Sequence, residues 1–210
     1  MSINLKQEYL QHDYVWPPVL MRLLEHRARW YLANRMRTWD ESLYLHAVNT
    51  AAYSYYAGNY LGIKGDYLNN LVLGAFFHDF AKADWPRCLL CKELDKPDLI
   101  TVHAHPTVGA QKVMEEWLDV PDVVVRIIRE HHERADGSGY PNGYKKKDIH
   151  PLSLIVSAIE VYVALQEPRG YRKRSYTREE ALVEVNRYYS NEIVGVLSLM
   201  STIPLNGLNR

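Results

Sequence analysis

Residues 131–141 read HHERADGSGYP, and they follow an apolar run at positions 123–128 that has the spacing of a helix. Two adjacent histidines therefore stand at the carboxyl end of an expected helix. Neighbouring helical residues point about 100° apart, so His131 and His132 cannot both face an apolar core. Imidazole is the commonest metal ligand, and two diverging imidazoles suit two adjacent metal ions. By itself, the stretch also fits a solvated histidine pair before an ordinary glycine-rich turn.

Further histidines lie on or beside other expected helices. His46 falls on a helix expected through about Tyr60, which a capping box from Thr38 to Glu41 would start. Taken alone, a single histidine on such a helix is more typical of a satisfied core residue. His105 stands where a helix running to about residue 118 is expected to begin, because Pro106 suits a first turn. His103 is an alternative ligand two residues earlier.

A histidine–aspartate pair ends the helix that follows the one carrying His46. Asp66 can cap this helix, and its last residues are His78-Asp79-Phe-Ala-Lys82. A buried pair of this kind, with a lysine one turn later, is costly unless the charges bind a metal or pair with one another. The pattern therefore favours a functional site over a structural one.

The second half of the chain adds one more candidate ligand. Glu160 is the single carboxylate of an apolar helix expected from Leu152 to about Leu165, where it either reaches the helix edge or coordinates something. A capping box at residues 177–180 and an apolar run at 191–200 predict further helices. Because no strand pattern is present, the sequence predicts an all-α fold.

The candidate ligands form one chemically consistent set. Five imidazoles and two carboxylates suit two divalent first-row transition-metal ions, such as iron or manganese. Asp79 is the best candidate for a carboxylate bridging the two ions, which would share and activate a water molecule. Lys82 could stabilise the charge that develops in the transition state. The seven residues are His46, His78, Asp79, His105, His131, His132 and Glu160.

The motif HHExxDGxGYP resembles the signature of the HD-GYP family, a branch of the HD metal-dependent phosphohydrolases. The resemblance runs from about His46 to Arg172. His46 matches the first-helix histidine of the family, His78-Asp79 with Lys82 matches its HD-x-x-K element, and His105 matches its next histidine motif. It implies an HD-superfamily helical bundle with the metal site in its core.

The resemblance also implies a function. It indicates a phosphodiesterase that opens a 3′,5′-cyclic dinucleotide, with cyclic di-GMP converted to pGpG and in some members on to GMP. The seven positions above would be the metal ligands. Arg169 and Arg172 fall where the family places basic residues that hold the substrate phosphates, and Tyr140 is the ligand-facing tyrosine of the signature.

The chain departs from the family pattern at three positions. Glu160 stands where the family has an aspartate ligand, and Val163 replaces a second aspartate of the same segment. Members with three metals carry a glutamate where this chain has Ser42, so two metals are expected. Two alternatives stay open: a hydrolase of another cyclic dinucleotide such as cyclic GMP-AMP, and a non-catalytic module that binds the dinucleotide or another protein.

Composition limits the remaining classes. The 210 residues carry no net charge and are 47% hydrophobic, so neither polymeric nucleic acid nor a membrane surface is an expected partner. With no signal pattern or membrane span, a cytoplasmic location is expected. The expected division is a helical extension at 1–40 and a phosphohydrolase domain at 41–210. Cys88 and Cys91 are expected to be reduced thiols, and a homodimer or a signalling-protein partner is left open.

Overall fold

The computed structural model describes residues 17–86, 89, 94–169, 172–200 and 203–205. These residues form α-helices, one 3-10 helix and loops, without a β-strand, which confirms the all-α prediction. In chain order the elements are α2 (Pro18–Leu24), α3 (Arg27–Trp39), α4 (Glu41–Tyr60), α5 (Gly65–Phe77), η1 (Phe80–Asp84), α6 (Lys96–Glu116), α7 (Asp122–Glu130), α8 (Pro151–Gln166), α9 (Arg178–Val185) and α10 (Asn191–Leu199).

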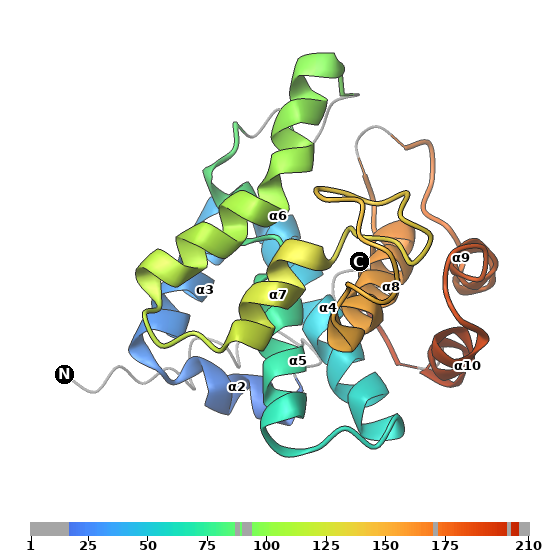
Figure 1. Cartoon of the computed structure of the whole chain (residues 1–210), viewed down its shortest axis with the longest axis horizontal. Helices are drawn as coiled ribbons and strands as arrows, with labels where there is room; N and C mark the ends of the chain where they lie inside the picture. Colours follow the sequence, from blue (N-terminus) through green and yellow to red (C-terminus); the bar gives the residue numbers. More distant parts are fainter. Residues whose placement is uncertain (1–16, 87–88, 90–93, 170–171, 201–202, 206–210) are drawn as a thin grey trace.

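Helices α4, α5, α7 and α8 form the centre of the molecule (Figure 1). Helix α5 packs against the other three, and its residues from Leu71 to Phe77 are all buried. Helix α6 packs on α7 and on η1, outside this centre. The main hydrophobic core lies between these helices, and its largest fully buried side chains include Phe76, Phe77 and Ile127.

A second, smaller core lies between α8 and the last two helices. Helices α9 and α10 cover the side of α8 that faces away from α7 (Figure 1). Tyr162 and Val163 of α8 are fully buried there, together with Tyr53 of α4. Helix α8 therefore contributes apolar side chains to both cores, whereas Glu160 is a buried charged residue that belongs to neither.

The described residues before position 40 contribute to the main core. Leu20 and Leu24 of α2 and Leu32 and Met36 of α3 are buried in the same cluster as α5 and α7. The division of the chain at residue 40 stays a prediction, but the described part of the proposed extension is packed against the central helices. The prediction that Cys88 and Cys91 are reduced thiols concerns two positions that both lie outside the described residues.

Two predicted helix starts are wrong. The N-cap of α4 is Asp40, whose carboxylate accepts a hydrogen bond from the Leu43 amide at 2.9 Å. Thr38 cannot take that role because it lies in the last turn of α3, where its hydroxyl donates to the Asn34 carbonyl. Helix α5 begins at Gly65 after the N-cap residue Lys64, so Asp66 lies in its first turn.

Helix α6 begins nine residues before the predicted position. Asp95 and Asp98 form a reciprocal capping box, and the helix then runs through Pro106 without ending. A proline inside a helix removes one amide donor, and here the carbonyl without its usual partner is that of Val102. His105 uses this carbonyl, as described below. The expected helix start at His105 is therefore wrong.

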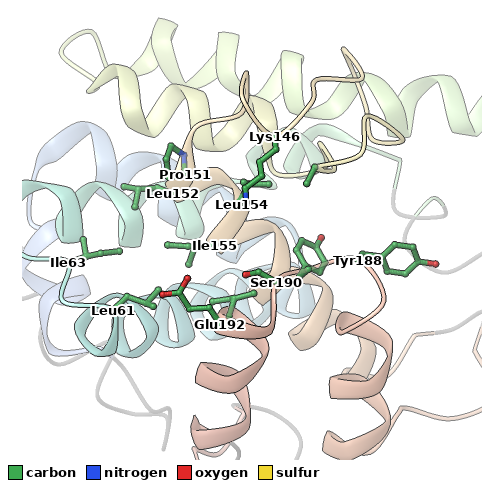
Figure 2. Close-up of a pocket in the computed structure, with 13 residues that line it drawn as sticks. Leu61, Ile63, Lys146, Pro151, Leu152, Leu154, Ile155, Tyr188, Ser190 and Glu192 are labelled. Carbon is green, nitrogen blue, oxygen red and sulfur yellow. The ribbon is translucent and has the colours of Figure 1, made fainter.

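An apolar pocket of about 640 Å³ lies beside the start of α8 (Figure 2). Pro151, Leu152 and Ile155 of α8 line it, together with Leu61 and Ile63 from the turn between α4 and α5. The histidines of the predicted site are not among the residues that line this pocket. Separately, none of the described helices is both long and apolar enough to cross a membrane.

Candidate metal centre

Six of the seven predicted ligands converge from separate elements. His46 lies in the middle of α4, His78 caps the end of α5, and Asp79 follows it. The side chains form two groups that share Asp79, and within each group the ligand atoms lie within 4.8 Å of one another. One group holds His46, His78 and Asp79, and the other holds Asp79, His105, His131 and His132.

Asp79 faces the two groups with different oxygens. Its Oδ2 lies 3.4 Å from Nε2 of His78 and 3.8 Å from Nε2 of His46. Its Oδ1 lies 3.2 Å from Nε2 of His105 and 3.8 Å from Nε2 of His131. A carboxylate with one oxygen directed to each of two imidazole clusters has the arrangement of a ligand that bridges two ions.

Backbone carbonyls orient three of these imidazoles. In each, Nδ1 lies within hydrogen-bond distance of the carbonyl oxygen three residues earlier, so Nδ1 donates its hydrogen and Nε2 carries the free lone pair. The three pairs are His78 with Ala75 at 2.7 Å, His105 with Val102 at 2.5 Å, and His131 with Ile128 at 2.8 Å. Such contacts fix the ring orientation of metal-binding histidines.

Several ligand atoms are buried without a hydrogen-bond partner. They include Nε2 of His46, Nε2 of His78 and Oδ1 of Asp79. In addition, Nε2 of His105 and Nε2 of His131 lie 3.1 Å apart, and their lone pairs face one another. Adjacent nitrogen ligands about 2.1 Å from one ion would lie about 3 Å apart. The buried donor atoms therefore fit a metal ion.

The electrostatics of the group formed by Asp79, His105, His131 and His132 favour its metal-binding protonation states. Burial lowers the pKa of His105, His131 and His132, and for the last two the lowering is large. Burial alone would raise the pKa of Asp79, but Lys82 and His78 outweigh it and hold that pKa well below its usual range. Neutral imidazoles beside an ionised carboxylate are the forms that coordinate a metal.

Two further predicted site residues, Lys82 and Glu160, lie close to this centre. The Lys82 ammonium donates to Oδ2 of Asp79 at 2.5 Å. Glu160 is buried in α8, and its charge acts to raise the pKa of both His78 and Tyr140. It is not a member of either group of converging ligand atoms, so its assignment as a ligand stays a prediction.

Tyr140 lies in a stack of three rings beside the metal centre. Its ring stacks on His132 with centroids 4.6 Å apart and on His103 with centroids 4.3 Å apart. His103, the alternative ligand, therefore stacks on Tyr140 and is not a member of either group of converging ligand residues. A pocket of about 400 Å³ opens here, lined among others by His132, Tyr140 and Arg134. An open pocket with a predicted metal ligand in its wall can admit a substrate.

The two predicted phosphate-binding arginines differ in their contacts. Arg169 donates to Oε2 of Glu167 at 3.1 Å, and its side chain is 24% exposed. Arg172 donates to the carbonyl oxygens of Ala164 and Leu165 at the end of α8. Arg172 thus binds backbone carbonyls at the end of α8. Arg169 instead binds the carboxylate of Glu167, which contacts His46 of the metal centre.

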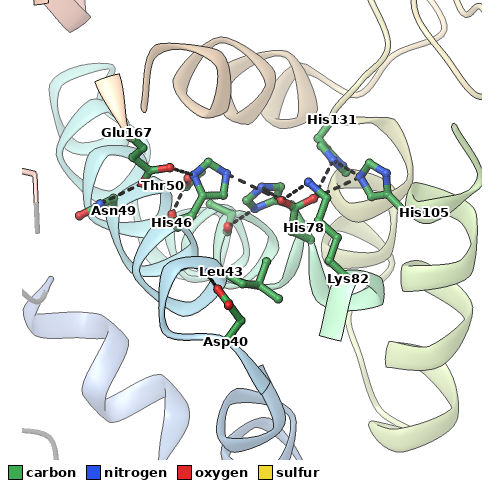
Figure 3. A network of polar contacts seen from close by, with 12 residues as sticks. Asp40, Leu43, His46, Asn49, Thr50, His78, Lys82, His105, His131 and Glu167 are labelled. Carbon is green, nitrogen blue, oxygen red and sulfur yellow. Dashed lines mark hydrogen bonds and ion pairs between the residues drawn. The ribbon is translucent and has the colours of Figure 1, made fainter. Parts of the chain in front are cut away.

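Two buried carboxylates beside the site were not singled out in the sequence. Glu167 accepts a hydrogen bond from Nδ1 of His46 at 2.8 Å (Figure 3). Glu133, in the signature, is fully buried and accepts from the backbone amides of Asn142 and Tyr144. Its position next to two histidines was visible, but nothing in the sequence pattern separates a ligand from a loop anchor. Glu167 carries no local signal, because its partner is distant in the chain.

A family model described as the HD domain matches residues 18–193. The chain is 31% identical over 141 residues to the cyclic di-GMP phosphodiesterase PA4108 from Pseudomonas aeruginosa, covering 66% of this chain and 34% of that protein. It is 28% identical over 151 residues to the 3′3′-cGAMP-specific phosphodiesterase 1 from Vibrio cholerae, covering 67% and 33%. The chain thus spans about a third of the length of these curated relatives.

A solved structure is also similar. It is described as Bd1817, an HDG"Y"P protein from Bdellovibrio bacteriovorus, and it superposes with a TM-score of 0.63 at 26% sequence identity. The match covers 74% of this chain and 51% of the other. The family model and the similar solved structure therefore agree with the motifs in indicating an HD domain.

Proposed function

The chain belongs to the HD domain family, and from that premise we propose that it is a metal-dependent phosphodiesterase that hydrolyses a 3′,5′-cyclic dinucleotide. The observation that carries the proposal is the orientation of the Asp79 carboxylate, because each of its oxygens faces a different imidazole cluster. We propose cyclic di-GMP as the substrate and pGpG as the product. The similarity to cyclic di-GMP phosphodiesterases supports this choice.

The proposed ligands are the seven predicted residues, with two divalent ions such as iron or manganese. When bound, these ions would polarise the phosphoryl oxygens and lower the pKa of water so that it can attack phosphorus. His46 and His78 would hold one ion, and His105, His131 and His132 the other, with Asp79 shared. Glu160 is proposed as a further ligand from α8.

The chain contributes polar groups around the reacting phosphate. Lys82, on Oδ2 of Asp79, keeps that carboxylate ionised and places a positive charge beside the ligand cluster. This charge would stabilise the negative charge that develops on the phosphoryl group. Tyr140 borders the open pocket next to His132, where a nucleotide would approach the metals. Arg169 is proposed to hold a substrate phosphate.

Cyclic GMP-AMP is a second candidate substrate. The chain is 28% identical to a phosphodiesterase named for 3′3′-cGAMP, close to its identity with the cyclic di-GMP enzyme. Both substrates share the phosphodiester linkage that the metal centre would cleave, and they differ in one base. Discrimination between the two substrates would therefore depend on the residues that contact the bases and not on the metal ligands.

The proposal is tested with anaerobically purified protein. Its metal content is measured, and the products from cyclic di-GMP and from 3′3′-cGAMP are analysed with manganese or ferrous iron present. We expect about two metals per chain and the appearance of pGpG. Metal without hydrolysis of either dinucleotide would overturn the phosphodiesterase assignment in favour of a binding module. Protein that takes up no metal would overturn the metal centre.

The variant Asp79→Ala tests the assignment of the shared ligand. Because Asp79 contacts both clusters, its removal should abolish metal retention and hydrolysis together. An Asp79→Ala protein that kept both metals and full activity would contradict the assignment of this residue.

A further inference from the structure

A histidine that binds a metal through Nε2 almost always donates its Nδ1 hydrogen to a carbonyl, a carboxylate or water. His78 and His131 stand at the ends of α5 and α7, where a carbonyl of the last turn is free to accept. His105 uses the carbonyl that Pro106 leaves without an amide donor. His46 has neither arrangement, because it lies inside α4 and the carbonyls of a helix interior already accept helical hydrogen bonds.

A side chain from the far end of α8 fills this role for His46. Glu167 is the residue directly after α8, and its carboxylate reaches across to α4 (Figure 3). Its Oε2 lies 2.8 Å from Nδ1 of His46, and its Oε1 accepts from the side-chain amide of Asn49 at 3.2 Å. Arg169 donates to the same Oε2 at 3.1 Å. Three contacts therefore hold a carboxylate whose side chain is only 11% exposed.

The direction of the hydrogen bond follows from the chemistry of the two groups. An ionised carboxylate only accepts, so Nδ1 of His46 must carry the hydrogen and Nε2 the lone pair. That Nε2 is buried without a hydrogen-bond partner and lies 3.8 Å from Oδ2 of Asp79. A ring flipped about its axis would turn a carbon toward Asp79 and lose the contact with Glu167.

We propose that Glu167 is a positioning residue that orients the His46 imidazole for metal binding, in the place that a backbone carbonyl takes for His78, His105 and His131. This inference rests on the metal centre of the proposed function. Arg169 contacts the same carboxylate, so the residue proposed to hold a substrate phosphate also supports the orientation of a metal ligand. Glu167 acts through His46 and not on the substrate.

The test measures Mn²⁺ binding to metal-free protein by calorimetric titration, without using activity. Loss of an outer contact of this kind lowers metal affinity by about 10–100-fold. We expect Glu167→Leu to weaken one of two Mn²⁺ sites by that factor. Glu167→Gln keeps an oxygen that can accept from Nδ1 and should fall between Glu167→Leu and the unchanged protein, as a partial rescue.

Thr50→Val is the matched control. Thr50 is fully buried one turn after His46 and donates to its backbone carbonyl at 2.8 Å, so the substitution removes a polar contact of the same residue without touching its ring. We expect unchanged Mn²⁺ affinity in this variant. Thermal unfolding of the metal-free proteins checks folding, and Glu167→Gln alone carries the test if Glu167→Leu does not fold.

The outcomes separate this inference from the proposed function. Equal Mn²⁺ affinity in Glu167→Leu and the unchanged protein would overturn the positioning role and leave the metal centre standing. An equal loss in Thr50→Val would also overturn it, because the effect would then be structural. An unchanged protein that bound no Mn²⁺ would overturn both.

Discussion

His105, His131 and His132 share a property that follows from burial. Their pKa values lie below the ordinary value of 6.5 because the protein interior disfavours the charged imidazolium. In the unfolded chain the same residues take up protons at a higher pH. Their contribution to stability is therefore complete above 6.5 and is lost as the pH falls below that value toward the folded-state pKa. His78 acts in the opposite direction, because its pKa is raised.

Metal-free protein is accordingly expected to lose stability in mild acid. The three lowered histidines of the metal centre, together with His150, whose pKa burial also lowers, outweigh the one raised histidine. Each lowered histidine contributes at most about 1.4 kcal/mol per pH unit. Denaturant unfolding of the metal-free protein at about pH 7.5 and about pH 5.5 measures the effect. We expect a lower free energy of unfolding at the more acidic pH. Equal values at both would contradict the burial of neutral imidazoles.

Arg169 provides a second prediction for a single residue. Replacing it by alanine should raise KM about tenfold, because one charge-assisted contact to a phosphate is lost. Metal content should remain near that of the unchanged protein, since Glu167 keeps its contacts with His46 and Asn49. Steady-state kinetics and metal analysis are measured side by side. Arg169→Lys, which keeps the charge without the planar group, should show a smaller rise in KM.

At the scale of the element, α4 depends on the cap that precedes it. Asp40→Ala removes the side-chain acceptor for the Leu43 amide and should lower the free energy of unfolding by about 1 kcal/mol. Thr38→Ala removes only hydroxyl contacts with the carbonyls of Asn34 and Arg35 within α3 and should cost less. Denaturant unfolding compares the two variants. A larger loss for Thr38→Ala would restore Thr38 as the cap.

The signature loop is an element held by one buried carboxylate. Glu133 accepts from the amides of Asn142 and Tyr144 at 2.8 and 2.9 Å, and Gly139 has no room for a side chain against the backbone of His132. Glu133→Gln replaces one acceptor oxygen with an amide group, which leaves an amide without its partner at a cost of about 1–3 kcal/mol. The loop should open more readily while the helices keep their stability.

Amide hydrogen exchange measures this opening directly. The amides of Asn142 and Tyr144 should exchange faster in Glu133→Gln, while amides in the middle of α5 serve as the internal reference. Unchanged protection at both amides would show that other contacts hold the loop.

At the scale of the whole molecule, the metal centre connects the central helices. Its predicted ligands come from α4, α8 and the ends or interiors of α5, α6 and α7, so bound ions would link most of the bundle. An ion present at about 100 times its dissociation constant adds about 2.7 kcal/mol of stability. For a chain of 210 residues this corresponds to a rise in Tm of about 5–10 °C.

Chelation should therefore lower the Tm of metal-loaded protein by that amount, and added Mn²⁺ should restore it. Scanning calorimetry measures both steps. Asp79→Ala, which lacks the shared ligand, should show no shift with chelator. A chelator-insensitive Tm in metal-loaded protein would contradict the structural role of the ions.

Much of this arrangement could be predicted from local patterns in the sequence. Apolar spacing located α7 and α8, the capping box at residues 177–180 started α9, and the motifs named the six side chains that converge. These signals are local because helical periodicity and capping involve residues within one or two turns. The start of α4 was misjudged because α3 runs on to Trp39 and includes Thr38. The start of α6 was misjudged because Asp95 caps a helix that continues through Pro106.

Other features depended on packing between distant parts of the chain. Glu167 and His46 are 121 positions apart, and no periodicity or spacing connects them. Only the fold brings the end of α8 to the middle of α4, where an interior imidazole needs an acceptor that its own helix cannot supply. The same applies to the two oxygens of Asp79, whose separate directions are set by helices arriving from different sides. Residue types and local structure are encoded along the chain, whereas the orientation of each ligand is set by tertiary contacts.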